Sequence, residues 1–82
     1  MNNTFQPKYP NAIRLLRLAR GLSTSSLGKQ IDVSQSLISR AELKGHGIGK
    51  ANWNKLADFF GVAPWELHDP TLPQKRPELF SK

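Results

Sequence analysis

Four polar side chains lie close together at helical spacing: Gln35, Ser36, Ser39 and Arg40. The amide of Gln35 can donate and accept hydrogen bonds together, which suits the N6/N7 edge of adenine, while the guanidinium of Arg40 suits the O6/N7 pair of guanine. The two serines are short enough to let a helix lie deep in a groove. This pattern favours base readout in the DNA major groove; an ordinary solvated helix face is the simpler alternative.

The surrounding residues predict how these side chains are positioned. Residues 23 to 43 carry two short helical patterns joined by a tight turn at Asp32 and Val33. Ser23 is expected to cap the first helix, residues 24–31, and Ser34 the second, residues 35 to about 43. Such a helix-turn-helix places its second helix in the major groove.

The remaining pattern predicts a five-helix, all-α domain over residues 10–68, with a flexible arm at 1–9 and an extended tail at 69–82. A first helix should run from Pro10 to Arg20, because proline suits the first helical position and Gly21 suits the end. A fourth should span residues 50–60, where apolar residues recur at i, i+3, i+4 and i+7. Pro64 should begin a short fifth helix. Gly28, inside the second helix, indicates close approach of another helix.

Three basic side chains, Lys44, His46 and Lys50, flank or lie in the glycine-rich loop after the predicted recognition helix. Glycines let backbone N–H groups approach phosphate oxygens, and lysines release counterions from DNA. The alternative is a solvated loop. The glycine spacing fits neither the P-loop nor the dinucleotide fingerprint, so a nucleotide-binding loop is excluded.

Composition agrees with a polyanionic partner. The 82 residues carry a net charge of +6, and eight basic against four acidic side chains lie between residues 10 and 68. The N-terminus lacks the apolar core of a signal peptide and no long apolar run could cross a membrane, so we expect a cytoplasmic protein. With no cysteine and two isolated histidines, we expect no metal site, no cofactor and no catalytic residues.

Several apolar and basic side chains are harder to assign. Leu37 is expected to face outward, where it could contact a thymine methyl. Leu15 and Leu18 could pack within the chain, against Phe5, Tyr9, Leu72 or Phe80, or contact a second subunit; we favour packing within the chain, and a subunit contact for Trp65. Arg14 and Arg20 could contact phosphates, but solvated positions are favoured.

From Ile13 to Leu67 the chain resembles the Cro and lambda-repressor-like (XRE-type) helix-turn-helix family of phage and bacterial regulators. The residues that carry the resemblance are I-R-x-L-R-x-x-R-G-L-S at 13 to 23, Leu27, V-S-Q-S-x-I-S-R at 33 to 40, Glu42, L-A at 56 and 57, and G-V at 61 and 62.

The resemblance implies a role for each candidate residue. It implies that Gln35, Ser36, Ser39 and Arg40 read base edges. It implies that Thr24 contacts a phosphate and braces the recognition helix, and that Arg17 and Glu42 form a partly buried ion pair.

Three positions depart from the family pattern. The family usually has Gln at Thr24, Ala at Gly28 and Gly at Asp32. Thr24 is too short to reach Gln35, and Asp32 must accept a left-handed conformation at modest cost.

We therefore expect a repressor of phage or prophage type that binds operator DNA as a homodimer and occludes a promoter. One alternative is an antitoxin that also captures a partner protein through its C-terminal tail. Another is a protein-interaction module without DNA binding. An enzyme is the most remote alternative.

Overall fold

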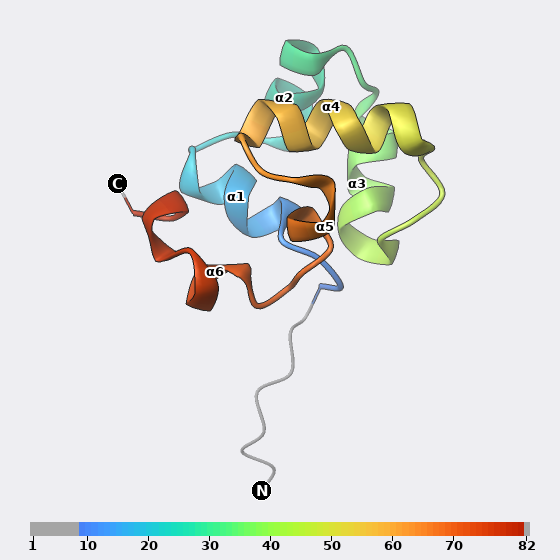
Figure 1. Ribbon diagram of the computed structural model, residues 1–82. Coiled ribbons are helices and arrows are strands. Elements are labelled where there is room, and N and C mark those ends of the chain that lie inside the picture. Colours follow the sequence, from blue (N-terminus) through green and yellow to red (C-terminus); the bar gives the residue numbers. More distant parts are fainter. Residues whose placement is uncertain (1–8, 82) are drawn as a thin grey trace, which may run out of the picture.

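The computed structural model describes residues 9–81, and these residues form an all-α domain in which no strand occurs (Figure 1). The α-helices are α1 (Ile13–Ala19), α2 (Thr24–Ile31), α3 (Gln35–Lys44), α4 (Lys50–Phe60), α5 (Pro64–Leu67) and α6 (Leu72–Lys75), followed by a 3₁₀ helix, η1 (Pro77–Leu79). The predicted all-α class is confirmed. Of the arm expected at residues 1–9, only Tyr9 is among the described residues. Phe5 lies outside them.

The first helix begins later than predicted. Pro10 precedes α1, whose N-cap is Ala12, and the Asn11 side chain accepts a hydrogen bond from the N–H of Ile13, the first helical residue, at 3.1 Å. The Asn11 amide also donates to the Ala41 carbonyl at 2.6 Å, which ties the start of α1 to α3. The prediction that Pro10 would open the helix was wrong: the helix begins at Ile13, whose N–H is satisfied by the Asn11 side chain, and Asn11 is itself held by α3.

The helix-turn-helix is capped as the sequence indicates. The Ser23 hydroxyl accepts a hydrogen bond from Ser26 N at 2.9 Å, and the Ser34 hydroxyl accepts one from Leu37 N at 3.2 Å. The helix α2 ends at Ile31 and is followed by its C-cap, Asp32, whose φ of 58° is left-handed. Among the described residues, Asp32 is the one non-glycine with positive φ.

A single hydrophobic core lies between the helices. Leu16, Leu27, Ile38, Leu56 and Phe60 are each at most 1% exposed, and they come from four different helices. Burial of side chains of this size contributes roughly 1.5–3 kcal/mol each before entropy is counted. Trp53 also belongs to this core, as predicted, and its ring is stacked on His68 with centroids 4.0 Å apart. The core therefore joins α1 and α4 to both helices of the helix-turn-helix.

The expectation of an extended tail was wrong. Residues 69–81 fold back beneath α1 as α6 and η1 (Figure 1), and Leu72 is 1% exposed. Arg76 donates to both carboxylate oxygens of Glu66, at 3.1 and 2.9 Å, and also bonds Glu78. Three prolines obscure helical periodicity, but two of them, Pro73 and Pro77, stand in the first turns of short helices, where proline is tolerated.

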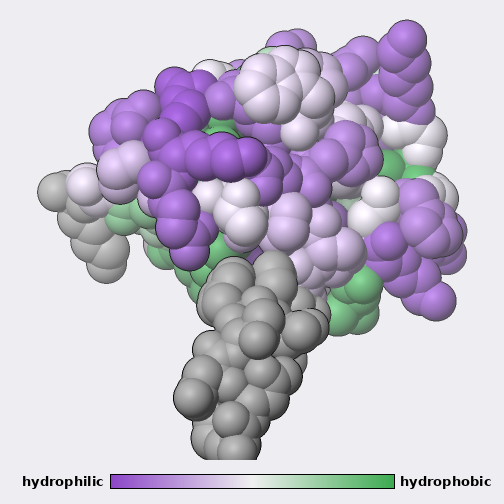
Figure 2. Space-filling model, turned by 60° about the horizontal axis from the view of Figure 1, so that its bottom comes forward, coloured by the Kyte–Doolittle hydropathy of each residue, from purple (hydrophilic) through white to green (hydrophobic). Residues whose placement is uncertain are grey.

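The folded C-terminal segment lies on the face seen in Figure 2, which is largely hydrophilic with smaller hydrophobic areas. Lys75 donates to Asp69 at 2.7 Å, and this contact, with the Thr71 hydroxyl and N–H, lowers the pKa of Asp69 to about 2. The pKa of Glu66 is also lowered, by the Ala63 N–H and the Arg76 guanidinium. Charged contacts thus hold the segment in place at neutral pH. Across residues 9–81, the helices are all too short or too polar to cross a bilayer.

Candidate nucleic-acid interface

The predicted base readers lie on one side of α3, toward its start and middle. Gln35, Ser36 and Arg40 are exposed and Ser39 is half-buried, whereas Ile38 and Ala41, from the opposite side of the helix, are fully buried. The polar face is therefore available to a partner while the apolar face fixes the helix to the core. Leu37 differs from expectation: it is half-buried and packs against the core, so its outward orientation was a wrong prediction.

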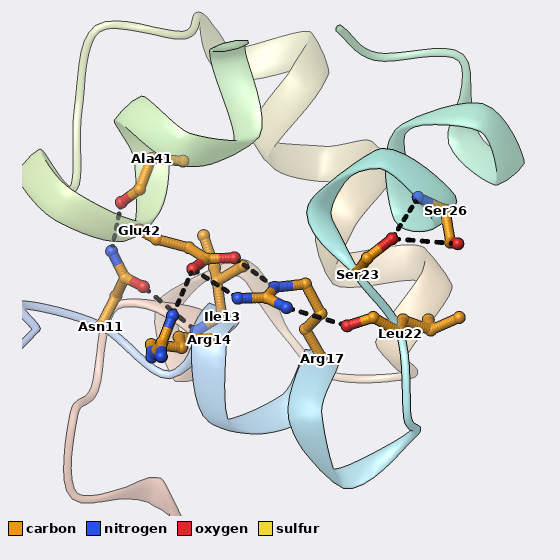
Figure 3. Close-up of polar contacts among 9 residues, drawn as sticks. All are labelled: Asn11, Ile13, Arg14, Arg17, Leu22, Ser23, Ser26, Ala41 and Glu42. Carbon is orange, nitrogen blue, oxygen red and sulfur yellow. Dashed lines mark hydrogen bonds and ion pairs between the residues drawn. The ribbon is translucent and has the colours of Figure 1, made fainter. Parts of the chain in front are cut away.

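A buried ion pair holds α3 against α1 (Figure 3). The Arg17 guanidinium donates from Nε to Glu42 Oε2 at 2.7 Å and from Nη2 to Oε1 at 3.1 Å. The two side chains are only 7% and 4% exposed. Nη1 of Arg17 also donates to the Leu22 carbonyl at 2.8 Å, so the charge is paired and hydrogen-bonded on three nitrogens. The pair implied by the resemblance is present, and it belongs to the scaffold.

The other two arginines of α1 have intramolecular contacts. Arg14 lies 3.9 Å from Glu42 Oε1 and over the ring of Tyr9 (Figure 3 shows the Glu42 contact). Arg20 donates to the carbonyls of Phe59 and Phe60 at 3.2 and 3.3 Å, at the C-terminal end of α4. A cation suits that end of a helix, where carbonyls have no partner within the helix. Arg20 is exposed and Arg14 is half-buried, so both keep access to solvent as the sequence favoured, but each also has contacts within the chain that the sequence did not predict.

The turn between α2 and α3 is unusually close to α2. A Cβ added at Gly28 would clash with the backbone carbonyl oxygen of Val33. The nearest neighbour of Gly28 is therefore the turn, and α3 lies close behind it, with Ile38 Cδ1 at 3.3 Å and Gln35 N at 3.6 Å from the added Cβ. The Gly28 carbonyl accepts hydrogen bonds from the N–H groups of Asp32 and of Val33, the latter at 3.0 Å. This backbone contact fixes where α3 begins.

The predicted phosphate contacts lie at three element boundaries. Thr24 is the half-buried first residue of α2, Lys44 ends α3 and Lys50 begins α4, both lysines being exposed. His46 is an exposed residue of the connecting loop. His46 and Lys50 line one hollow of about 470 Å³ together with Trp53. The structure thus brings two of the four candidates to a common surface depression beside the end of α3.

One contact of a candidate reader was not foreseen. Arg40 Nη1 donates to the carbonyl oxygen of Gly47, in the loop after α3, at 3.4 Å. Gly45 ends α3 with a φ of 74°, and Gly47 and Gly49 also have positive φ. The three glycines were noticed in the sequence, but the direction in which they turn the loop requires the structure.

Three comparisons place the chain among known proteins. A family model described as helix-turn-helix matches residues 13–67. A curated hypothetical transcription factor of Neisseria meningitidis serogroup B is 33% identical over 69 residues, which is 84% of this chain and 63% of that relative. This chain therefore spans less than two thirds of the relative's length.

A solved structure agrees with the sequence comparisons. The crystal structure of a hypothetical transcription factor from Neisseria superposes with a TM-score of 0.67 at 27% identity, covering 99% of this chain and all of that one. The similarity extends over the C-terminal segment as well as the helix-turn-helix, since nearly the whole chain is aligned.

Proposed function

This chain belongs to the Cro and lambda-repressor-like helix-turn-helix family, and we propose that it regulates transcription by binding a specific sequence of double-stranded DNA. Its relatives are described as hypothetical transcription factors. The finer proposal is a repressor of phage or prophage type, which occludes a promoter by occupying an operator. To occlude a promoter, the protein has only to bind the operator tightly and in the right place, and no chemical step is required.

The observation that carries the proposal is the contrast between the two sides of α3. Its inner side is held by the Arg17–Glu42 pair and by Asn11, while Gln35, Ser36 and Arg40 stay exposed. A rigid helix with exposed bidentate side chains suits base readout, because little conformational entropy remains to be lost when the bases are contacted.

Backbone contacts would orient the helix in the groove. We assign these to Thr24, Lys44, His46 and Lys50, which lie at the start of α2 and around the α3–α4 loop. Contacts to phosphates set register and orientation and contribute affinity without sequence information. They should make binding strongly dependent on salt.

We further propose that the protein binds as a homodimer. One recognition helix contacts too few base pairs for useful selectivity, and two helices related by a two-fold axis contact half-sites about 34 Å apart. Trp65, on α5, is 70% exposed, which makes it the strongest candidate for the subunit contact among the described residues. Large exposed aromatic side chains are enriched at such contacts.

The antitoxin alternative gains no support from the C-terminal segment. A partner that captured the segment as an extended peptide would have to extract Leu72 from the core and break the Arg76–Glu66 contacts. Both steps oppose binding.

Selection of bound sequences from random duplex DNA tests the function directly. It should return one motif with two-fold symmetry. Gln35→Ala and Arg40→Ala should each weaken binding to the selected duplex by about 1–3 kcal/mol while changing affinity for random duplex little. Gln30→Ala, an exposed glutamine on α2, is the matched control and should change neither.

Two outcomes would reject the proposal. If selection enriches no sequence, the chain has no sequence-specific DNA site. If Gln35→Ala and Arg40→Ala bind the selected duplex with the same affinity as Gln30→Ala, α3 is not the element that contacts the bases. If sedimentation shows a monomer both free and on the palindromic duplex, only the proposed homodimer is rejected.

A further inference from the structure

The contact between Arg40 and the glycine-rich loop has a consequence for DNA sequence preference. We propose that Gly47 is a positioning residue: it orients the Arg40 guanidinium and thereby sets the base preferred opposite Arg40. This inference rests on the proposed function, because it requires that Arg40 contact a base.

The geometry supports a positioning role on three grounds. The Gly47 carbonyl oxygen accepts a hydrogen bond from Arg40 Nη1 at 3.4 Å. A Cβ built on Gly47 would lie 3.3 Å from Arg40 Cδ, closer than ordinary van der Waals contact. The backbone at Gly47, with φ at 86°, is also one that residues with a side chain rarely adopt. Glycine therefore supplies the acceptor, the backbone conformation and the space for the arginine stem at one position.

The chemistry of this contact suits an arginine that must later bind a base. Arg40 is exposed, and a free arginine side chain loses considerable rotamer freedom when it is ordered. The loop carbonyl restricts that freedom in advance. Because the acceptor is neutral and the bond is long, the positive charge remains and the other guanidinium N–H groups stay available for a bidentate contact. A carboxylate in the same place would compete with DNA.

The neighbouring glycine provides a matched control. Gly49 has a φ of 87°, almost that of Gly47, but a Cβ added there would meet nothing within 4 Å. Alanine at either position therefore has to adopt a φ that residues with a side chain rarely take. Only alanine at Gly47 also crowds Arg40.

The test compares Gly47→Ala, Gly49→Ala, Arg40→Ala and the double variant Gly47→Ala/Arg40→Ala. Each is measured for affinity to the selected duplex, to random duplex, and to duplexes with single base changes. Gly47→Ala should weaken binding to the selected duplex about three- to tenfold more than Gly49→Ala, part of the roughly 5- to 150-fold that a bidentate arginine contact supplies. Preference should relax mainly at the base pair affected by Arg40→Ala. In the Arg40→Ala background, Gly47→Ala should have no further effect on that preference.

Gly47→Asn covers the case in which the alanine variant folds poorly, because asparagine tolerates positive φ while still carrying a Cβ. The positioning role is overturned if the variants at Gly47 and Gly49 lose the same affinity, or if the loss at Gly47 persists without Arg40. If instead Arg40→Ala itself leaves base preference unchanged, the base contact assigned to Arg40 in the proposed function is wrong. That outcome is distinguishable from a failure of the positioning role, because it is measured on Arg40→Ala alone.

Discussion

Removing Glu42 should destabilise the domain more than removing any exposed acidic residue. Glu42→Ala leaves the Arg17 guanidinium buried, with the Leu22 carbonyl as its remaining acceptor among the described residues. An uncompensated buried charge of this kind costs about 3–5 kcal/mol. A domain of 82 residues has a total stability of only about 4–12 kcal/mol. The variant should therefore lose a large part of its free energy of unfolding, because Arg14, which also lies beside Glu42, is itself a cation and cannot replace the carboxylate.

Equilibrium unfolding in urea, followed by helical circular dichroism, measures this loss. Glu78→Ala is the control, because Glu78 also pairs with an arginine at 3.1 Å but its side chain is 63% exposed. We expect that control to lose at most about 1 kcal/mol. Replacing both buried partners, as Arg17→Met/Glu42→Leu, should cost less than Glu42→Ala alone, because no unpaired charge remains.

Two results would refute this reasoning. The first is a loss for Glu42→Ala no larger than that for Glu78→Ala, which would mean that the Arg17 charge finds solvent. The second is a double variant at least as unstable as the single one. Shape complementarity between α1 and α3, rather than charge burial, would then explain the destabilisation.

Three further predictions concern the turn, the C-terminal segment and the DNA contacts. Gly28→Ala should lower the free energy of unfolding by about 1–3 kcal/mol, because its Cβ meets the Val33 carbonyl; urea unfolding that matches wild type would contradict the clash. Asp69 has a folded pKa of about 2, below its ordinary value of 3.8, so its contribution to stability is complete above about pH 4 and is lost as pH falls toward 2. Thermal unfolding of Asp69→Asn should show a weaker pH dependence across that range, and an unchanged profile would count against the Lys75 contact. Lys50→Ala should reduce the salt dependence of DNA binding by about one unit of log–log slope, and an identical slope would remove Lys50 from the phosphate contacts.

Local signals explain which elements the sequence could predict. The helices α2 and α4 have the predicted bounds because their ends are encoded by neighbouring residues, Ser23 at one start and Gly61 at one end. The start of α1 was misplaced because two adjacent residues, Pro10 and Asn11, both signal a helix start. The choice of Asn11 depends on Ala41, a partner thirty residues away.

Long-range contacts explain what sequence patterns could not predict. The C-terminal segment has no periodicity of its own, and it folds because Arg76 reaches Glu66 and Leu72 enters the core. The Arg17–Glu42 pair, 25 residues apart, was accessible through family resemblance and not through spacing. Leu37 was misassigned because helical spacing cannot say where the core ends, and a half-buried position satisfies either assignment.

The departures from the family pattern around the turn form one structural solution. Thr24 cannot brace Gln35 as a longer side chain would, yet α3 is held at its start by the backbone. The Gly28 carbonyl accepts two N–H groups from the turn, and the missing Cβ at Gly28 lets the Val33 carbonyl approach. Asp32 takes the left-handed conformation that this turn requires, and Lys55 of α4 donates to its carbonyl at 3.3 Å. A brace between side chains is thus replaced by contact between α2 and the turn. Because Gln35 immediately follows Ser34, which caps α3, the same contact fixes the first residue that we propose to contact a base.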